Sequence, residues 1–274
     1  MRQIPFVSLY TYPLITLIQL DFVSLALAAG MMAIAVGLSA WQRLGLEWSL
    51  TIATGRAVIQ LLIMGALLSV VFDKQNRNPW LTLVILGVML AIAAIVARNR
   101  ISQKVPRLLP LVWGAIFVAT LLTLSYVSLL IIRPATWYDP QYIIPLAGIT
   151  IGNAMNGSSI AGERFVSTLN SSRLEIETHL SLGATPQQAV AQYRREAVKA
   201  GMIPTLNTMM VVGVVTLPGI LTGQLLSGVD PLNAAAYQIL IMFMLAFATL
   251  VTTLLITEGL FRQFFNPAAQ LTLH

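Results

Sequence analysis

The chain has 274 residues, of which 57% are hydrophobic and 9% are charged, whereas charged residues make up about 25% of an average soluble protein. So few charges cannot cover a soluble protein of this length, and the sequence predicts an all-α polytopic membrane protein. The net charge of +6 does not indicate a nucleic-acid partner, because the basic residues lie in short gaps between apolar runs. The absence of cysteine, with only two histidines, excludes disulfides, thiolate metal sites and a histidine metal cage.

Seven apolar runs have the scale of membrane-spanning helices, which need about 20 residues each. In chain order they are 22–42, 57–72 (extended to Thr51 if Arg56 is included), 78–97, 108–132, 140–162, 200–229 and 231–257. Residues 1–20 contain Pro5 and Pro13, and we expect them to lie at the membrane interface rather than to form a signal peptide. Because the connections are short, the sequence predicts one transmembrane domain over residues 1–274.

The basic residues predict the orientation, since cytoplasmic loops carry an excess of Lys and Arg. With the N-terminus outside and the C-terminus in the cytosol, 12 of the 16 basic residues fall on the inner side. The remaining four, on the outer side, are Arg2, Lys74, Arg77 and Arg133.

Each run that begins on the outer side follows an Asp or Asn. These residues are Asp21, Asn78, Asp139 and Asp230. Three of them precede a proline, and an Asx cap followed by proline is a strong helix-start signal. We interpret them as helix caps; the alternative is that they attract cations to an outer mouth.

The segment 163–199 is the one long connection, and it is expected on the cytosolic side. Gly183 can take the left-handed conformation that ends a helix. Thr185 and Gln188 have the spacing of a capping box, with Pro186 at the first helical position. The sequence therefore predicts two helices joined by a tight corner, which either lies on the membrane or projects to dock a motor protein.

The corner also resembles a known coupling element. Glu177 stands six residues before Gly183, as in the EAA loop of ABC-transporter permeases. The residues assigned to ATPase coupling are Glu177, Leu182, Gly183, Ala184, Thr185 and Pro186.

Polar side chains inside the runs are candidates for a transport path, because an unpaired amide in hydrocarbon is costly. Asn153 and Asn156 lie one helical turn apart, and they either line a path or join helices. Gly148 and Gly152 form a small-xxx-small pair that allows close helix approach.

Pro218 is expected to break the run 200–229, and a break at membrane depth is tolerated only against protein or a water-filled cavity. Gln224, one turn beyond, favours a pore-facing break over a static kink. Arg56 either snorkels to the interface or forms an ion pair with Glu163. The candidate path residues are Asn153, Met155, Asn156, Asn207, Pro218, Gln224 and Gln60; the residues identify no metal site.

Six short motifs occur together along the chain. They are Arg56-x-x-x-Gln60-Leu-Leu, Gly152-Asn-Ala-Met-Asn156, Ser181-Leu-Gly-Ala-Thr-Pro186, Leu217-Pro-Gly, Asp230-Pro and Tyr237-Gln-Ile. With these motifs in this order, the chain resembles the FetB-type permeases from the first run to about Arg262. Those are bacterial membrane subunits of an ABC exporter implicated in iron efflux, and they are related to plant aluminium-tolerance permeases.

The resemblance implies a permease subunit in the bacterial inner membrane that exports a metal cation, with iron as the leading cargo. It also implies a homodimer that binds two copies of a separate cytosolic ATPase, which would hold the ATP and Mg. None of the lysines follows a glycine as in a phosphate-binding P-loop. We therefore expect this chain to bind no cofactor and to be no enzyme by itself.

A different class of transporter is the rival interpretation. An ion-gradient-driven secondary transporter or channel for a small polar or cationic solute would use Glu163 and Glu258 as proton carriers. A transporter of this class would have no evident use for the corner at Gly183. An intramembrane enzyme is disfavoured, because the sequence offers no paired acid–base or metal constellation.

Overall fold

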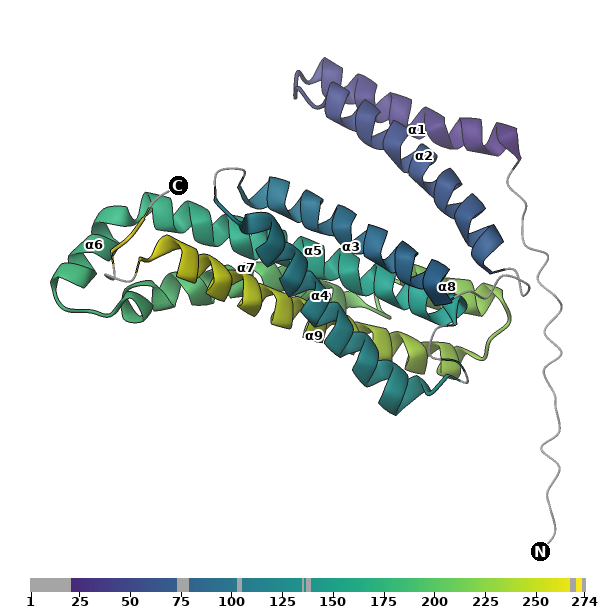
Figure 1. Ribbon diagram of the computed structural model, residues 1–274. Coiled ribbons are helices and arrows are strands. Elements are labelled where there is room, and N and C mark those ends of the chain that lie inside the picture. Colours follow the sequence, from purple (N-terminus) through teal and green to yellow (C-terminus); the bar gives the residue numbers. More distant parts are fainter. Residues whose placement is uncertain are drawn as a thin grey trace, which may run out of the picture. The chain divides into compact units, whose positions relative to one another are not determined.

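The computed structural model describes residues 21–72, 79–102, 105–134, 136, 139–266 and 270–272, and within these ranges the chain is helical almost throughout (Figure 1). The α-helices of the described residues are α1 (Phe22–Trp41), α2 (Glu47–Val71), α3 (Pro79–Ile101), α4 (Leu108–Tyr126), α5 (Pro140–Ser171), α6 (Arg173–Ser181), α7 (Pro186–Val211), α8 (Gly219–Leu226) and α9 (Pro231–Phe264). A π-helix, Val127–Ile132, continues α4. The all-α prediction is confirmed.

Five helical segments of the described residues are long and apolar enough to cross a membrane. They are Val23–Trp41, Glu47–Val71, Pro79–Ile101, Leu108–Ile132 and Pro231–Phe264. The two other predicted spans correspond to α5 and α7, whose polar residues lower their hydropathy. With 32 residues, α5 is about 48 Å long, which exceeds the hydrocarbon thickness of about 30 Å. The seven-span count and the orientation stay predictions.

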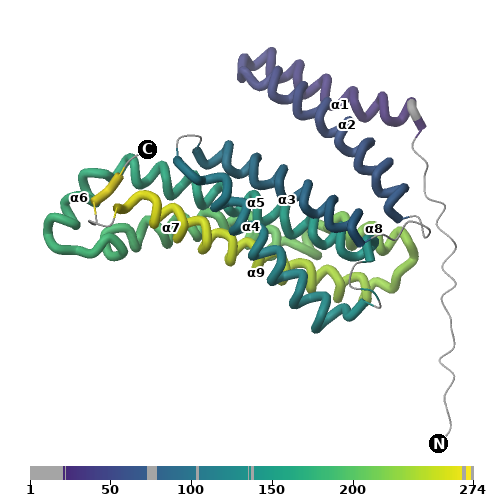
Figure 2. Tube along the Cα trace, viewed as in Figure 1, coloured from purple at the N-terminus to yellow at the C-terminus, as the bar shows by residue number. Residues whose placement is uncertain are grey.

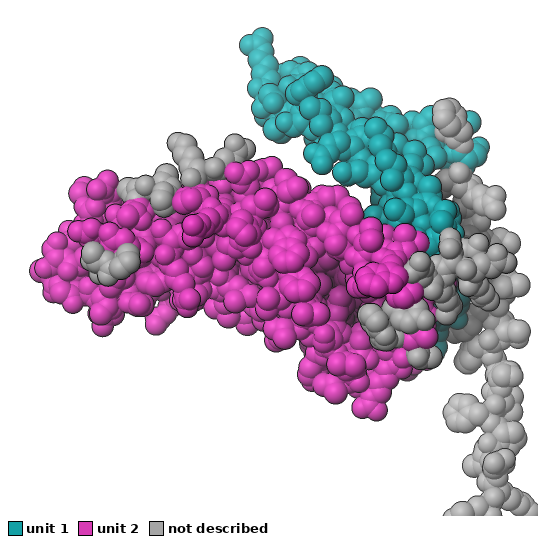
Figure 3. Space-filling view, viewed as in Figure 1, with its two compact units in different colours: residues 1–77, 223–230 teal, residues 78–222, 231–274 magenta. Residues whose placement is uncertain are grey.

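The chain divides into two compact units (Figure 3). The first unit comprises residues 1–77 and 223–230, and the second comprises 78–222 and 231–274. The prediction of one domain over 1–274 stays a prediction, and residues 1–20 lie outside the described part of the chain.

In the first unit, α1 and α2 form a helical hairpin. The carboxylate of Asp21 accepts hydrogen bonds from the hydroxyl and amide of Ser24, at 2.7 and 2.9 Å. These bonds lower the pKa of Asp21 and confirm that this residue caps α1. At the other end, Gly45 turns the chain with φ +70°, and the Ser39 hydroxyl donates to Glu47 Oε1 at 2.9 Å.

The second unit is organised around α5, which packs against α3, α4, α7 and α9 (Figure 2). Asp139 caps α5 by accepting from the Gln141 amide at 3.2 Å, with Pro140 at the first position. Among the largest side chains buried in this core are Leu108, Ile116, Phe165, Leu169, Ile256, Leu260 and Phe264. The cap predicted at Asn78 lies outside the described residues.

Helices α5 and α7 approach each other closely at Gly157 and Gly201. A Cβ atom on Gly201 would lie 2.7 Å from the Gly157 carbonyl oxygen. By contrast, nothing lies within 4 Å of a Cβ on Gly152, and a Cβ on Gly148 would meet only the terminal methyl of Met89. Within this chain, the close contact between small residues of α5 and another helix therefore lies at Gly157 and not at the predicted pair Gly148 and Gly152.

The run 200–229 is broken, but the break begins before Pro218. Helix α7 ends at Val211, and Gly213 has φ +83°. Most of the residues from Val211 to Thr216 are β-branched, and such residues lose side-chain freedom in a helix. Pro218 lies just before α8, where its carbonyl accepts from the Thr222 amide at 3.0 Å. The predicted helix breaker thus stands at the start of the next helix.

Candidate functional site

The first candidate site is the corner between α6 and α7, whose predicted geometry is confirmed. Gly183 has φ +90°, and its amide donates to the Leu180 carbonyl at 3.0 Å. The capping box is complete: the Gln188 amide donates to Thr185 Oγ1 at 3.3 Å, and the Thr185 amide donates to Gln188 Oε1 at 2.9 Å. The corner therefore has a fixed shape set by its own residues.

Side chains on α6 and α7 attach this corner to the bundle. Ile176 of α6 is fully buried in the main core. Burial and a hydrogen bond to Glu175 raise the pKa of Tyr193 on α7. The two helices are thus held to each other and to the core, so a force on the corner reaches α7 directly.

The outer surface of the corner is apolar at its tip. Leu182 is 81% exposed and follows the end of α6. Glu177 forms an exposed i,i+4 ion pair with Arg173 at 2.7 Å. An exposed leucine on a rigid turn, beside a charged helix, offers an anchor and polar contacts to a docking protein.

The second candidate site is the polar part of α5. Asn153 Nδ2 donates to the Ile149 carbonyl of its own helix at 3.0 Å. Asn156 Oδ1 accepts from Arg100 Nη1 of α3 at 3.1 Å. Both amides therefore have a hydrogen-bond partner in the protein, and Asn156 remains exposed beside a cation. Met155 packs against the main core instead, and the path assignment of these residues stays a prediction.

The third candidate site is a cavity of about 390 Å³ beside the break that follows α7. Its lining includes Met209, Gly213 and Leu221 from the break region and Gln238 and Met242 from α9. Gln238 is 5% exposed, and its Oε1 atom is buried without a hydrogen-bond partner. A buried acceptor left unpaired costs about 1–3 kcal/mol, and reorientation of the Gln238 side chain into the cavity would relieve this cost by pairing the oxygen with a cation or water.

This site was not predicted from the sequence. Gln238 belongs to the Tyr237-Gln-Ile motif, which by itself assigns the residue no role. The signal was a glutamine inside the apolar run 231–257, which predicts burial but not the cavity. The thioethers of Met209 and Met242 lie on the same lining, and they are soft, weak donors.

The remaining predicted residues lie on α2, α7 and α8. Asn207 is exposed on α7. Gln60 and Arg56 lie on α2 and Gln224 on α8, all in the first unit, so their roles and the Arg56–Glu163 pair stay predictions. No group of three or more His, Asp or Glu that could hold a metal occurs in the described ranges.

Glu258, the rival proton carrier, is engaged in ion pairs instead. One of its oxygens lies 2.7 Å from Arg194 Nη1, and the other lies 2.8 Å from Arg262 Nε. Glu258 therefore joins α9 to α7 through Arg194, and its role as a proton carrier stays a prediction.

Comparison with known proteins identifies a family that matches most of the chain. Residues 22–265 match the family described as "Uncharacterised protein family (UPF0014)". The UPF0014 membrane protein slr1647 of Synechocystis is 48% identical over 93% of this chain and 98% of its own length. No solved structure matches.

Two further relatives carry functional names. The "Probable iron export permease protein FetB" of Escherichia coli is 34% identical, over 90% of this chain and 93% of its own. The protein "ALUMINUM SENSITIVE 3" of Arabidopsis is 33% identical, over 91% and 89%. The matched region includes the α6–α7 corner, the polar part of α5 and Gln238. With the apolar helices, these matches make the chain a multi-pass membrane protein.

Proposed function

The chain belongs to the UPF0014 family of membrane proteins, and from this premise we propose that it is the permease subunit of an ABC transporter. In this proposal, two copies of the chain span the membrane with seven helices each, N-terminus outside. Two copies of a separate ATPase bind in the cytosol and hydrolyse ATP with Mg. The permease itself binds no cofactor and catalyses no reaction.

The observation that carries this proposal is the α6–α7 corner. An ATPase that closes on ATP needs a rigid contact through which its motion reaches the transmembrane helices. The corner has the required properties: fixed backbone geometry at Gly183, a closed capping box at Thr185, and the exposed anchor Leu182. We propose that Glu177, Leu182, Gly183, Ala184, Thr185 and Pro186 form this coupling contact.

A metal cation is the proposed cargo, and iron is its proposed identity. The name of the Escherichia coli relative, an iron export permease, supports both the metal and the outward direction. The Gln238 oxygen with two thioethers is a weak donor set, and weak ligands suit a site that must release its cargo. Asn153 and Asn156 would line the path toward it.

The experiment that tests coupling compares Gly183→Val with Gly45→Val. Both glycines have positive φ, at +90° and +70°, and a Cβ on either would meet nothing within 4 Å. Valine in this conformation costs about 1–2 kcal/mol, so each change reshapes one turn at similar cost. Each variant is co-expressed with a candidate ABC ATPase from the same genome and reconstituted in liposomes.

We expect Gly183→Val to uncouple ATP hydrolysis from iron transport by at least about tenfold, while Gly45→Val keeps both activities coupled. Co-purification of the ATPase is measured in parallel. Normal ATPase association and normal transport in Gly183→Val would refute the coupling assignment. Transport driven by an ion gradient without any ATPase would refute the ABC proposal as a whole.

A further inference from the structure

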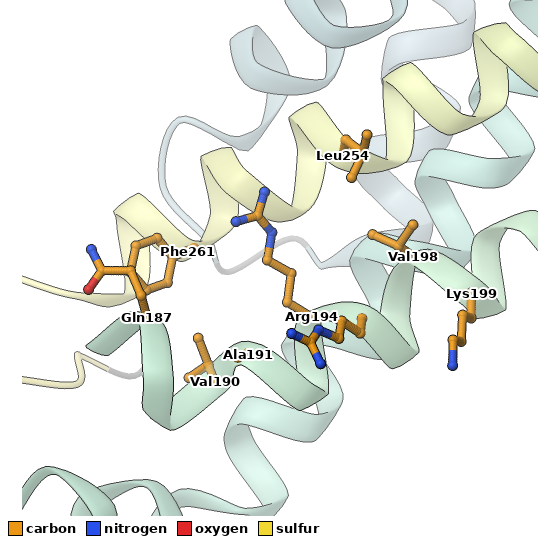
Figure 4. A pocket seen from close by; sticks show the side chains of 9 residues that line it. Gln187, Val190, Ala191, Arg194, Val198, Lys199, Leu254 and Phe261 are labelled. Atoms are coloured by element: carbon orange, nitrogen blue, oxygen red, sulfur yellow. The ribbon is translucent and has the colours of Figure 1, made fainter. Parts of the chain in front are cut away.

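A basic groove of about 460 Å³ lies between α7 and α9, and its lining begins at Gln187 beside the α6–α7 corner. Its basic residues come from consecutive turns of α7: Arg194, Arg195 and Lys199. Its apolar lining includes Val198 from α7 and Leu254 and Phe261 from α9. Figure 4 shows Leu254 and Phe261 on one side of the groove and Val198 and Lys199 on the other. The groove thus combines cations with an apolar wall.

Two of the three cations form no ion pair within the described part of the chain. Arg194 Nη1 lies 2.7 Å from Glu258 Oε2, and its Nε donates to Thr257 Oγ1 at 3.4 Å. Arg195 and Lys199 are exposed, and neither forms an ion pair within the described residues. Arg194 is therefore part of the wall, whereas Arg195 and Lys199 are available to an anion.

The position of the groove along both helices indicates its depth in the membrane. Lys199 is the last charged residue of α7 before the uncharged stretch 200–211. Glu258 is the first charged residue of α9 after the uncharged stretch 231–257. Both helices leave their apolar parts at this level, so the groove lies where the hydrocarbon meets the headgroups.

We propose that this groove binds the phosphate of an anionic phospholipid. Arg195 and Lys199 contact the phosphate, and an acyl chain packs against Val198 and Leu254. Basic pockets between transmembrane helices are suited to such headgroups. A soluble phosphate shares the charge but has no chain to cover the apolar wall, so the wall favours the lipid. This inference depends on the membrane location of the chain and not on its proposed cargo or ATPase.

The test measures phospholipid binding to the full-length chain in detergent by native mass spectrometry. Phosphatidylglycerol, phosphatidylcholine and soluble glycerol 3-phosphate are titrated in parallel. The test variant is Arg195→Gln/Lys199→Gln, and the control is Arg98→Gln/Arg164→Gln, which removes two cations of the second unit that do not line the groove. Arg164, Arg195 and Lys199 are exposed and Arg98 is half-buried, and thermal melting of both variants is expected to match the original chain.

The original chain and the control are expected to prefer phosphatidylglycerol over phosphatidylcholine, with weaker binding of glycerol 3-phosphate. The test variant is expected to lose about tenfold or more in affinity for phosphatidylglycerol, because it lacks two cations. The variant Arg195→Lys/Lys199→Arg keeps both charges and is expected to keep the original affinity. An equal loss in test and control variants would overturn the proposal, since it would indicate diffuse attraction. Equal affinity for glycerol 3-phosphate would overturn the lipid assignment. Unchanged lipid binding with loss of a partner ATPase would show that the groove contacts protein instead.

Discussion

The tight packing at Gly201 predicts the outcome of adding one methyl group. In Gly201→Ala, the new Cβ would lie 2.7 Å from the Gly157 carbonyl oxygen, 2.8 Å from Thr253 Cγ2 and 2.9 Å from Ala161 Cβ. Ordinary contact begins near 3.4 Å, so the methyl group is too close by about 0.5–0.7 Å. Because one neighbour is backbone, rotation of a side chain cannot relieve the overlap. Helix α7 has to move away from α5 and α9.

The magnitude follows from two opposing effects. Overpacking a close-packed contact costs about 1–3 kcal/mol, whereas replacing Gly by Ala inside a helix gains about 1 kcal/mol. Gly152→Ala is the matched control, because it also lies inside a helix and its Cβ meets nothing within 4 Å. The gain in helix propensity from replacing Gly by Ala is the same in both variants. We therefore expect Gly201→Ala to be about 1–3 kcal/mol less stable than Gly152→Ala.

The assay is unfolding of the purified chain in mixed micelles with increasing SDS, followed by tryptophan fluorescence. Gly148→Ala provides an intermediate point, since its Cβ would meet only the flexible end of Met89 at 3.0 Å. The expected order of stability is Gly152→Ala, then Gly148→Ala, then Gly201→Ala. Equal stability of Gly201→Ala and Gly152→Ala would show that α7 does not lie against α5 at Gly157.

Three further changes have distinct expected outcomes. Asn156→Leu should keep expression, dimerisation and ATPase binding but lose cargo-dependent transport; loss of assembly with normal transport per complex would assign Asn156 only to its hydrogen bond with Arg100. Thr185→Ala should destabilise the start of α7 by about 1 kcal/mol, measured by SDS unfolding, and Thr185→Ser should not. Gln238→Leu should raise stability by about 1–3 kcal/mol, because it removes an unpaired buried acceptor, and should abolish transport in liposomes. A destabilised Gln238→Leu with normal transport would mean that this oxygen is hydrogen-bonded in the membrane and holds no cargo.

The α6–α7 corner was predictable from sequence because its determinants are local. Gly183 and the Thr185–Gln188 pair act within a few residues of each other, so their spacing alone defines the turn and the helix start. The caps at Asp21 and Asp139 were predictable for the same reason. In each case the hydrogen-bond partner lies two or three residues away.

Contacts between distant helices could not be predicted in the same way. The sequence shows several small residues on α5, but only packing decides that Gly157, rather than Gly152, faces another helix. Similarly, Glu258 pairs with Arg194 from a helix 64 positions earlier in the chain, and nothing local selects that partner. The unpaired oxygen of Gln238 became visible only through its burial, which depends on α7 and α9 together.

Helix α7 has the dimensions of a lever. Its 26 residues give a rod about 39 Å long, with the corner at one end and the Gln238 cavity at the other. It packs tightly on α5 and α9 at Gly201, about 22 Å from the corner end and about 15 Å from the other. A rod that pivots there moves its cavity end by about two thirds of the corner's displacement, in the opposite direction. Pro204, just past the pivot, removes one helical hydrogen bond, so the short arm bends more easily than the long one.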